Sequence, residues 1–374
     1  MKIAIIGTRG IPNRYGGFEQ FAEYLSVGMV KSGHQVTVYN AHDHPWQKPS
    51  WEGVRIIHCY DPHRLGTAGQ FIYDLNCILD TRRHHFDIIL QLGYTSSTVW
   101  GWLLPRKKSV VTTNMDGLEW MRSKYSLPVQ HFLRYAEKLG VRYSDHLIAD
   151  SPGIQTYLRE KYKQEALYIP YGANIFEHPD VAIPAKYRLV PYQYNMLIAR
   201  LEPENNIETI LDGVALQAVP KPFIVIGNAD TKYGKILLQK YAGVKHIRFE
   251  GSMYNQDVLN NLRYYSNCYF HGHSVGGTNP SLLEAMASHA LVCAHDNIFN
   301  RAVLEDNGFY FSSAAEVLAL LENVSRENEV QKITQNLEKI KHQYACKTIV
   351  DQYLKHFETI LEARNVSKAM SYSR

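Results

Sequence analysis

Two glycine-rich segments of this sequence follow apolar runs and have the composition of anion-binding loops. The first runs from Arg9 to Phe18, after the apolar run KIAIIG, and contains the pair Gly16-Gly17. Glycines let backbone N–H groups approach a ligand, and the N-terminus of the helix expected from Phe18 favours a negative charge. A dinucleotide site is disfavoured, because the next strand ends in Asn40 instead of an acidic residue. A glycine-rich turn that binds nothing is the alternative.

The second segment, HGHSVGGTNPSLLEAMA, joins a strand to a helix expected to begin at Pro280. A loop of this kind before a helix N-terminus is suited to an anion. Glu284 follows one turn into the helix, where its carboxylate is placed to accept hydrogen bonds from ribose hydroxyls. A glutamate among apolar helix residues would be costly to bury unpaired. The alternative is a helix that only packs in the core. The expected anion-binding loop residues are Gly276, Gly277, Thr278 and Asn279.

Arg200 ends an apolar run in LIARLEPENN, just before a helix expected after Pro203. A guanidinium group offers a fork of donors that suits a diphosphate. The alternative is a surface pair between Arg200 and Glu202 or Glu204.

The segment TTNMDGLEWMRSKY places Asp116 and Trp120 after another strand. The Asp116 carboxylate could accept hydrogen bonds from a ligand or stabilise positive charge that develops on it. Its alternative role is an Asp-Gly turn that caps the next helix. Trp120 could stack on a ring-shaped ligand or pack in the core.

The elements that must position these residues alternate between short apolar strands and helix-length segments. Such alternation predicts two α/β domains, each with a doubly wound parallel sheet. Ligands bind such sheets in loops after the strand carboxyl ends, so we expect the chemistry in an interdomain cleft. Residues 177–193 contain three prolines and are predicted as the linker. The strands are predicted at 2–7, 35–40, 54–60, 86–93, 109–114 and 146–151, then at 194–201, 223–228, 246–251, 268–273 and 291–296.

The overall composition indicates a globular protein. The chain has 374 residues, 45% hydrophobic and 20% charged, which suggests two domains. A formal charge of +4 is too small to indicate nucleic acid, but fits an anionic substrate or weak attraction to an acidic membrane. The five scattered cysteines predict reduced, intracellular thiols and no zinc site. No signal peptide or spanning segment is expected, and a cytoplasmic location is predicted.

Three longer strings carry a family resemblance over nearly the whole chain: IIGTRGIPNRYGGFEQFAEYLS, NMDGLEWMRSKYS and HSVGGTNPSLLEAMA. The chain resembles the retaining GT-B glycosyltransferases of family 4, and within them a bacterial rhamnosyltransferase subgroup of cell-wall and capsular polysaccharide synthesis. The resemblance implies a Rossmann-like acceptor-side domain at 1–175 and a nucleotide-sugar donor domain at 176–345. A C-terminal helix from about 346 to 374 would pack back on the first domain or stay with the second.

The resemblance also implies the substrates and the catalytic route. The donor would be dTDP-L-rhamnose, and the acceptor a lipid-diphosphate-linked GlcNAc or Glc at the inner face of the cell membrane. The departing phosphate oxygen would take the acceptor proton, with no metal and no cofactor. Asp116, Arg200 and Glu284 are the expected catalytic residues. Asp116 would lie near the donor sugar, where its carboxylate would accept hydrogen bonds from sugar hydroxyls or stabilise positive charge that develops at the anomeric carbon. The donor site is expected to contain Arg200, Glu284 and the loop residues Gly276, Gly277, Thr278 and Asn279, together with Arg9, Gly16 and Gly17. The expected acceptor-binding residues are Tyr15, Phe18, Glu19 and Trp120.

Two departures from the wider family pattern concern the donor site. Gly276 stands where the family has the first of two glutamates, and Asn205 stands where it has a lysine that neutralises the diphosphate. One cation is therefore missing, and Arg9 and Arg14 are candidates to replace it. A UDP- or GDP-sugar donor, a nucleotide-sugar epimerase of the same shape and a binding module without catalysis are the alternative functions.

One further segment concerns the membrane. WGWLLPRKK (100–108) combines two tryptophans with three basic residues, which suits docking on anionic lipid. A core helix followed by a solvated basic turn is the equally good alternative.

Overall fold

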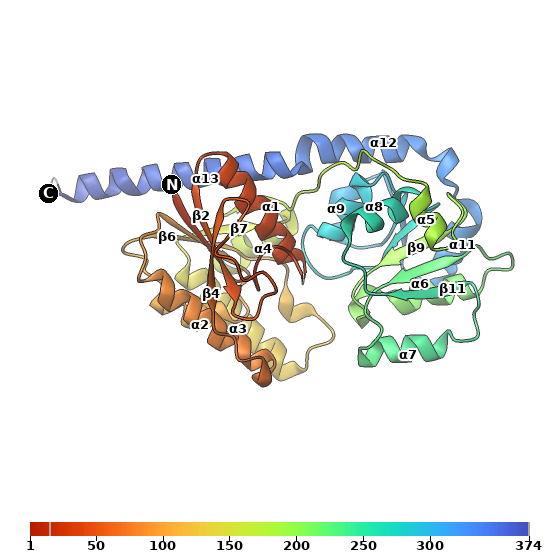
Figure 1. Cartoon of the computed structure of the whole chain (residues 1–374), viewed down its shortest axis with the longest axis horizontal. Helices are drawn as coiled ribbons and strands as arrows, with labels where there is room; N and C mark the ends of the chain where they lie inside the picture. Colours follow the sequence, from red (N-terminus) through yellow and green to blue (C-terminus); the bar gives the residue numbers. More distant parts are fainter. Residues whose placement is uncertain (15, 373–374) are drawn as a thin grey trace. The chain divides into compact units, whose positions relative to one another are not determined.

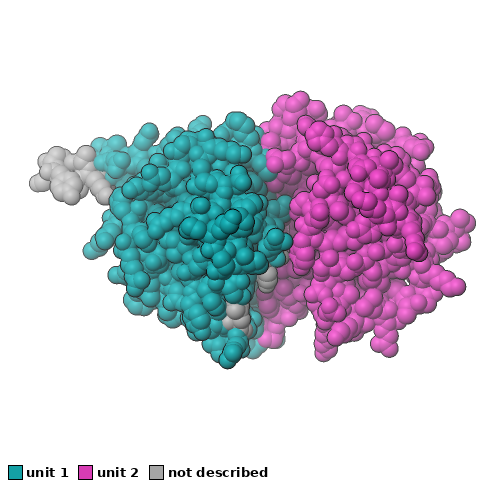
Figure 2. All heavy atoms as spheres, viewed as in Figure 1, with its two compact units in different colours: residues 1–120, 127–171, 346–374 teal, residues 121–126, 172–345 magenta. Residues whose placement is uncertain are grey.

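The computed structural model describes residues 1–14 and 16–372, so Tyr15, an expected acceptor-binding residue, lies outside the described residues. The chain forms two compact units (Figure 2). The first comprises residues 1–120, 127–171 and 346–374, and the second comprises 121–126 and 172–345. The short segment 121–126 thus clusters with the second unit, which a single division near residue 175 does not anticipate.

The first unit contains a sheet with the strand order β3-β4-β2-β1-β5-β6-β7-β8 within the described residues. All neighbours are parallel except the β3–β4 pair. The central strands are almost fully buried, as expected where helices cover both faces. The six predicted strands of this half are confirmed, and the short β3 and β8 were not predicted. The strands are β1 (Lys2–Ile6), β2 (Gln35–Ala41), β3 (Ser50–Trp51), β4 (Val54–Cys59), β5 (Ile88–Leu92), β6 (Val110–Asn114), β7 (His146–Ala149) and β8 (Ala166–Tyr168).

Helices cover this sheet on both faces (Figure 1). The C-terminal helix α13 belongs to the first unit and packs against α1, where a Cβ on Gly28 would lie 2.6 Å from Val350. The side chains of Tyr353 and Phe21 are in ring contact across the same interface. The helices are α1 (Gly17–Lys31), η1 (His63–Leu65), α2 (Thr67–Thr81), η2 (Ser97–Leu103), η3 (Glu119–Met121), α3 (Leu127–Tyr143), α4 (Pro152–Tyr162) and α13 (Cys346–Tyr372).

The second unit contains a parallel sheet with the order β11-β10-β9-β12-β13-β14 within the described residues. Its core is an apolar cluster that includes Phe223, Phe270 and Leu211. The five predicted strands are confirmed, while β14 was not predicted. The strands are β9 (Asn195–Ile198), β10 (Phe223–Ile226), β11 (Ile247–Gly251), β12 (Tyr269–His271), β13 (Val292–His295) and β14 (Phe309–Phe311).

Residues 177–193, predicted as a linker, are packed on the second unit. The Asp180 N–H donates to Asn261 Oδ1 at 2.6 Å, and a short helix, α5, contacts α8. The helices of this unit are α5 (Ala182–Lys186), η4 (Pro203–Asn205), α6 (Ile207–Ala215), α7 (Lys232–Lys240), α8 (Gln256–Tyr264), α9 (Pro280–Ala287), α10 (Ile298–Leu304), α11 (Ala314–Asn323), η5 (Arg326–Asn328), α12 (Val330–Lys339) and η6 (Ile340–Tyr344).

Each sheet reverses its direction of strand addition once. In the first sheet the chain runs outward from β1 in one direction and from β5 in the other; in the second sheet the corresponding pair is β9 and β12. Open α/β sheets bind ligands at the carboxyl ends of the strands beside such a switch point. The loops after these four strands are therefore the places to look for a site.

Candidate functional site

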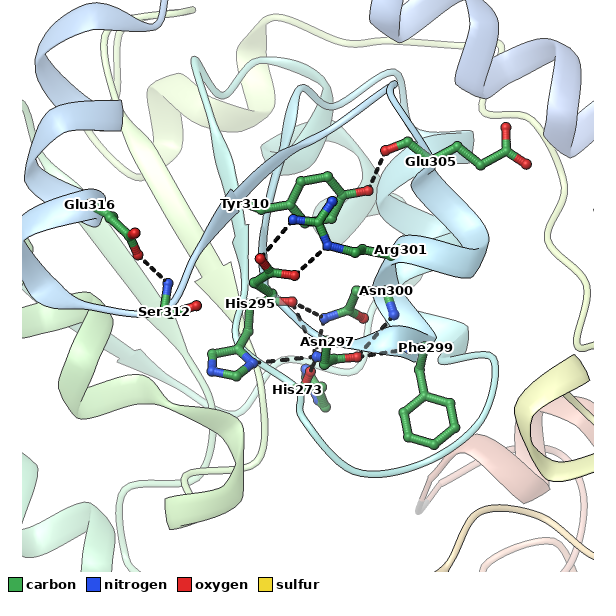
Figure 3. Close-up of polar contacts among 11 residues, drawn as sticks. His273, His295, Asn297, Phe299, Asn300, Arg301, Glu305, Tyr310, Ser312 and Glu316 are labelled. Carbon is green, nitrogen blue, oxygen red and sulfur yellow. Dashed lines mark hydrogen bonds and ion pairs between the residues drawn. The ribbon is translucent and has the colours of Figure 1, made fainter. Parts of the chain in front are cut away.

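The loop after β12 is fixed by Asn297, the N-cap of α10, and by Asn300 within that helix (Figure 3). The Nδ2 groups of Asn297 and Asn300 each donate to the carbonyl oxygens of His273 and His295, at distances of 2.8–3.1 Å. Asn297 Oδ1 also accepts from the N–H groups of Phe299 and Asn300, which caps the helix. The ends of β12 and β13 are thus clamped together, and the position of the following glycine-rich loop is defined.

The predicted loop-to-helix arrangement is present at 276–280. Gly276 has a φ of 131°, which favours glycine, and a Cβ there would meet no atom within 4 Å. Gly277 and Thr278 are buried. Asn279 Oδ1 accepts from the Ser281 N–H at 2.9 Å, and Pro280 is the first residue of α9. The loop therefore has open space above it at Gly276 and a helix N-terminus behind it, which suits an anion.

Glu284 has a buried cationic partner that the sequence did not reveal. Arg263 Nη2 of α8 lies 2.5 Å from Glu284 Oε2, and the exposed fractions of the two side chains are 1% and 13%. Arg263 Nη1 donates to Asn260 Oδ1 at 3.0 Å. The attraction to Arg263 offsets the desolvation of the carboxylate in an apolar helix. The pair also fixes the orientation of the Glu284 side chain.

A second group of charged residues lies after β9. Arg200 is exposed, and Asn205 is 5% exposed and donates through Nδ2 to the Arg200 carbonyl oxygen at 2.7 Å. Asn205 thus shapes the turn that carries Arg200. The segment 121–126 contributes two further cations: Arg122 Nη1 lies 3.8 Å from Glu204 Oε1, and Lys124 Nζ lies 3.8 Å from Glu202 Oε1.

The electrostatics of this region favour neutral histidine. Burial, followed by the guanidinium groups of Arg200 and Arg122, lowers the pKa of His273 to about 3. Its ring stacks on His271 with 4.3 Å between centroids. Burial and then the charge of Arg200 lower the pKa of Lys124. Arg122, Lys124 and Arg200 therefore form one positive region at the carboxyl edge of the second sheet.

In the first unit, packing within the fold requires glycine at positions 7 and 10 of the opening loop. A Cβ on Gly7 would lie 2.2 Å from the Leu92 carbonyl oxygen, and one on Gly10 would lie 2.4 Å from Asn40 Cγ. Asn40 clamps the loop by accepting from the Ile11 N–H and donating to the Ile11 carbonyl oxygen. Asn40, which stands where a dinucleotide site would have an acidic residue, therefore holds the opening loop in place.

The later glycines differ from these. Gly16 has a φ of −169°, an extended backbone open to any residue, and a Cβ there would meet only Glu19 Oε2, at 3.4 Å. The fold thus gives no steric reason for glycine at position 16, which is consistent with the approach of a ligand. Gly17 is the first residue of α1.

Glu19 and Arg9 are held by neighbours in their own unit. Glu19 is 5% exposed, and its Oε1 accepts from Thr8 Oγ1 at 3.2 Å and from the Arg9 N–H at 2.9 Å. Arg9 Nη1 lies 3.4 Å from Asp61 Oδ2, and the Asp61 side chain is 2% exposed. Arg14 is exposed. Glu19 therefore shapes the loop, and the charge of Arg9 is shared with a buried carboxylate.

A buried carboxyl group, Asp74 of α2, lies close to this pair. Ser96 Oγ donates to Asp74 Oδ2 at 2.5 Å, and Gln70 Nε2 donates to Oδ1 at 3.4 Å. Burial raises the pKa of Asp74 to about 7, against the opposing effects of Ser96, Gln70 and Arg9, with Asp61 raising it further. Asp74 was not singled out from the sequence, because its helix position shows no distinctive pattern.

Asp116 lies at a conformationally unusual position after β6. Its φ is 52°, and its N–H donates to Asn114 Oδ1 at 2.9 Å. The Tyr171 hydroxyl donates to Asp116 Oδ1 at 3.2 Å. Gly117, the next residue, lies at a bend of the chain. Phe18 packs beside Tyr171 and Gly93.

Trp120 is pinned in a polar cluster. Its Nε1 donates to Glu137 Oε2 at 3.0 Å, and the Arg134 guanidinium lies 4.3 Å from the ring centroid. Glu137 is 1% exposed and also accepts from Tyr157 and Lys161. These contacts hold the indole ring in the first unit and give it a packing role there.

Two hollows lie on the first unit. One of about 380 Å³ opens at the amino ends of β1 and β2 and is lined by Lys2, Arg55 and three histidines. This edge is opposite to the strand carboxyl ends, so we do not place the main site there. Among the described residues, no cluster of His, Cys, Asp and Glu could hold a metal, and no helix is long and apolar enough to cross a membrane.

Comparisons with known proteins identify the fold. Residues 1–174 match the sequence model of a domain of unknown function, DUF1972. No curated protein matches the chain. Sucrose-phosphate synthase from Thermosynechococcus elongatus is similar in structure, with 17% identity, a TM-score of 0.79 and coverage of 97% of this chain and 99% of that one.

Two further solved structures are also similar over almost their whole length. Anabaena HepE, in complex with UDP-glucose, has 14% identity and a TM-score of 0.76, with coverage of 96% of this chain and 99% of that one. An α,α-trehalose 6-phosphate synthase from Burkholderia multivorans has 12% identity and a TM-score of 0.71, with coverage of 98% of each chain. The predicted fold class is confirmed: the chain has the GT-B fold, with two Rossmann-like parallel-sheet units.

Proposed function

We propose that this chain is a glycosyltransferase whose sugar donor is a nucleoside-diphosphate sugar bound by the second unit. The observation that carries the proposal is the carboxylate of Glu284, oriented by buried Arg263 one turn into the helix that follows an anion-binding loop. A carboxylate so fixed suits ribose hydroxyls, while the loop and Arg200 suit the diphosphate. The similar HepE structure was obtained with UDP-glucose, which supports this class of donor.

The proposed reaction retains the anomeric configuration. The bond between the anomeric carbon and the phosphate oxygen breaks, and the acceptor hydroxyl oxygen bonds to that carbon from the same face. The departing phosphate oxygen takes the hydroxyl proton, so no protein base is needed. The protein stabilises the charge that grows on the diphosphate, through Arg200 and the backbone at 276–278. Asp116 is assigned to the donor sugar, and Phe18 and Glu19 to the acceptor side. No metal is assigned to the reaction, and we expect a chelator to leave the activity intact.

For the donor sugar we propose L-rhamnose from dTDP-L-rhamnose, and for the acceptor a lipid-diphosphate-linked GlcNAc or Glc. The support is the resemblance of the three long sequence strings to rhamnosyltransferases of cell-surface polysaccharide synthesis. Glu284 accepts from one or two hydroxyls, so its type alone does not distinguish deoxyribose from ribose. A UDP- or GDP-sugar is therefore the competing donor, and the UDP-glucose bound to HepE favours its inclusion in any test.

A lipid-linked acceptor requires approach to the inner face of the cell membrane. Trp102, at the end of η2, is 63% exposed, and Lys107 and Lys108 follow on the surface. Leu104 is buried, so only part of the segment 100–108 is open to lipid. An exposed tryptophan beside lysines suits an anionic bilayer surface. Flotation with anionic and neutral liposomes tests this; equal absence of binding to both would contradict it.

The proposed function is tested by incubation with dTDP-rhamnose, UDP-glucose and a GDP-sugar, with and without a lipid-linked GlcNAc or Glc acceptor. We expect a new lipid-linked disaccharide and one nucleoside diphosphate released for each sugar transferred. Isomerised donor in the absence of acceptor would indicate an epimerase instead. Tight donor binding without any product would indicate a binding module.

A further inference from the structure

The positive region after β9 contains cations that could neutralise a diphosphate in place of the family lysine, whose position is occupied by Asn205. Asn205 itself cannot act on a diphosphate as a cation, and its Nδ2 is engaged by the Arg200 carbonyl oxygen at 2.7 Å. The two other cations of the region come from the segment 121–126. This segment is flanked in sequence by the first unit, yet it clusters with the second.

Contacts with two carboxylates hold these cations beside the strand end. Lys124 Nζ lies 3.8 Å from Glu202 Oε1 and 4.0 Å from Glu204 Oε1, and Arg122 Nη1 lies 3.8 Å from Glu204 Oε1. Ser123 Oγ donates to Glu204 Oε2 at 3.4 Å. The Glu204 side chain is only 3% exposed, so it acts as a fixed anchor for the segment.

The same glutamate joins the cations to the anion-binding loop. Its carbonyl oxygen accepts from Ser274 Oγ at 2.7 Å and from the Ser274 N–H at 3.3 Å. Asn206 Nδ2 donates to the Gly272 carbonyl oxygen at 2.8 Å. Residues 204–206 therefore bind both the segment 121–126 and the start of the loop that leads to Gly276.

The charge balance of the region is suited to an added anion. Arg122, Lys124 and Arg200 carry three positive charges, whereas Glu202 and Glu204 carry two negative charges. Like charges repel one another in a partly buried environment. The repulsion from Arg200 and Arg122 is one reason why the pKa of Lys124 is lowered, after burial itself. A diphosphate would relieve this repulsion.

We propose that Lys124, supported by Arg122, is the cation that completes the diphosphate site with Arg200, in place of Arg9 or Arg14. The inference rests on the proposed function and extends it to the ligand class of a nucleoside diphosphate. Neither Lys124 nor Arg122 occupies the sequence position of the family lysine, where this chain has Asn205. The observed salt bridges to Glu202 and Glu204 would be exchanged in part for contacts with phosphate oxygens when the donor binds.

The test is calorimetric titration of the full chain with dTDP, UDP and GDP, and with dTMP as a ligand that lacks the second phosphate. We expect Lys124→Ala to weaken binding of the preferred diphosphate by about tenfold to a hundredfold, as the loss of a charge-assisted contact does. Binding of dTMP should change less. Lys124→Arg should recover most of the affinity, and Glu202→Gln should strengthen diphosphate binding, because it removes a competing carboxylate.

Lys240→Ala is the matched control. Lys240 also pairs with two carboxylates of the second unit, Glu208 at 2.6 Å and Asp212 at 2.7 Å, but it lies at the end of α7 and its partners belong to α6, outside the turn that carries Arg200. We expect diphosphate binding to be unchanged in this variant, and Arg9→Ala to weaken it less than Lys124→Ala does. If Lys124→Ala binds diphosphate like wild type, or if Arg9→Ala alone loses binding, the inference is overturned while the proposed function stands. If wild type binds none of the three diphosphates, the proposed function fails, and the inference with it.

Discussion

Asp74 offers a prediction whose magnitude follows from its surroundings. The side chain is 2% exposed, and burial raises its pKa to about 7 from the ordinary value of 3.8. A group whose pKa is raised on folding contributes stability that is complete below the unfolded pKa and is lost as the pH rises through the folded pKa. The difference corresponds to about 4 kcal/mol in total, of which about 3 kcal/mol falls between pH 5 and pH 8.

Replacement of Asp74 by Asn removes the titration while it keeps an acceptor for Ser96 Oγ, which lies 2.5 Å from Asp74 Oδ2. We expect the unfolding free energy of Asp74→Asn to rise relative to wild type by about 3 kcal/mol between pH 5 and pH 8. Because other groups titrate in both proteins, the informative quantity is this difference and not either curve alone.

The assay is urea unfolding of both proteins at pH 5, 6, 7 and 8, followed by a tryptophan signal of the first unit, with the transition midpoint and slope compared at each pH. Ser96→Ala serves as a control, because it removes the hydrogen bond and keeps the carboxyl group. Parallel curves for wild type and Asp74→Asn would contradict this prediction, since they would mean that Asp74 ionises in the folded chain as it does in the unfolded one.

Three more substitutions test the local arguments by chemical unfolding. Arg263→Met should lower the unfolding free energy by about 3–5 kcal/mol, because it leaves the Glu284 carboxylate without its cation; a loss below 1 kcal/mol would contradict this. Asp116→Ala should be less stable than Asp116→Asn by about 1 kcal/mol, because asparagine tolerates a φ of 52° better; equal stability would contradict the strain. Gly10→Ala should destabilise the chain, because its Cβ would lie 2.4 Å from Asn40 Cγ; Gly16→Ala, without such a clash, should not.

Much of the fold followed from the sequence because its strands are strongly patterned. The run KIAII is apolar and flanked by a glycine turn, and it forms the buried β1. The two-residue strand β3 and the three-residue strands β8 and β14 were missed, because a stretch so short carries no periodicity of its own. The segment 177–193 was mistaken for a linker, because prolines mark turns whether or not the turn is packed.

The candidate site was predictable only where a motif contains its own partners. The loop at 276–279 and the helix from Pro280 were found because they are contiguous. Arg263 was not found, because it reaches Glu284 from a separate helix and its surroundings in the sequence give no sign of this. Lys124 was missed for the same reason: its contacts with Glu202 and Glu204 join parts of the chain that are far apart in sequence.

The proposed function requires this chain to transfer a sugar from a nucleoside-diphosphate donor with its anomeric configuration retained. The most direct measurement is proton NMR of the reaction with the best donor of the panel and a lipid-linked acceptor, observed from the first minutes. We predict a disaccharide whose new linkage has the same anomeric configuration as the donor, with one nucleoside diphosphate formed for each linkage. A product of inverted configuration would contradict the proposed route, and the absence of transfer from every donor to a folded chain would contradict the proposed function itself.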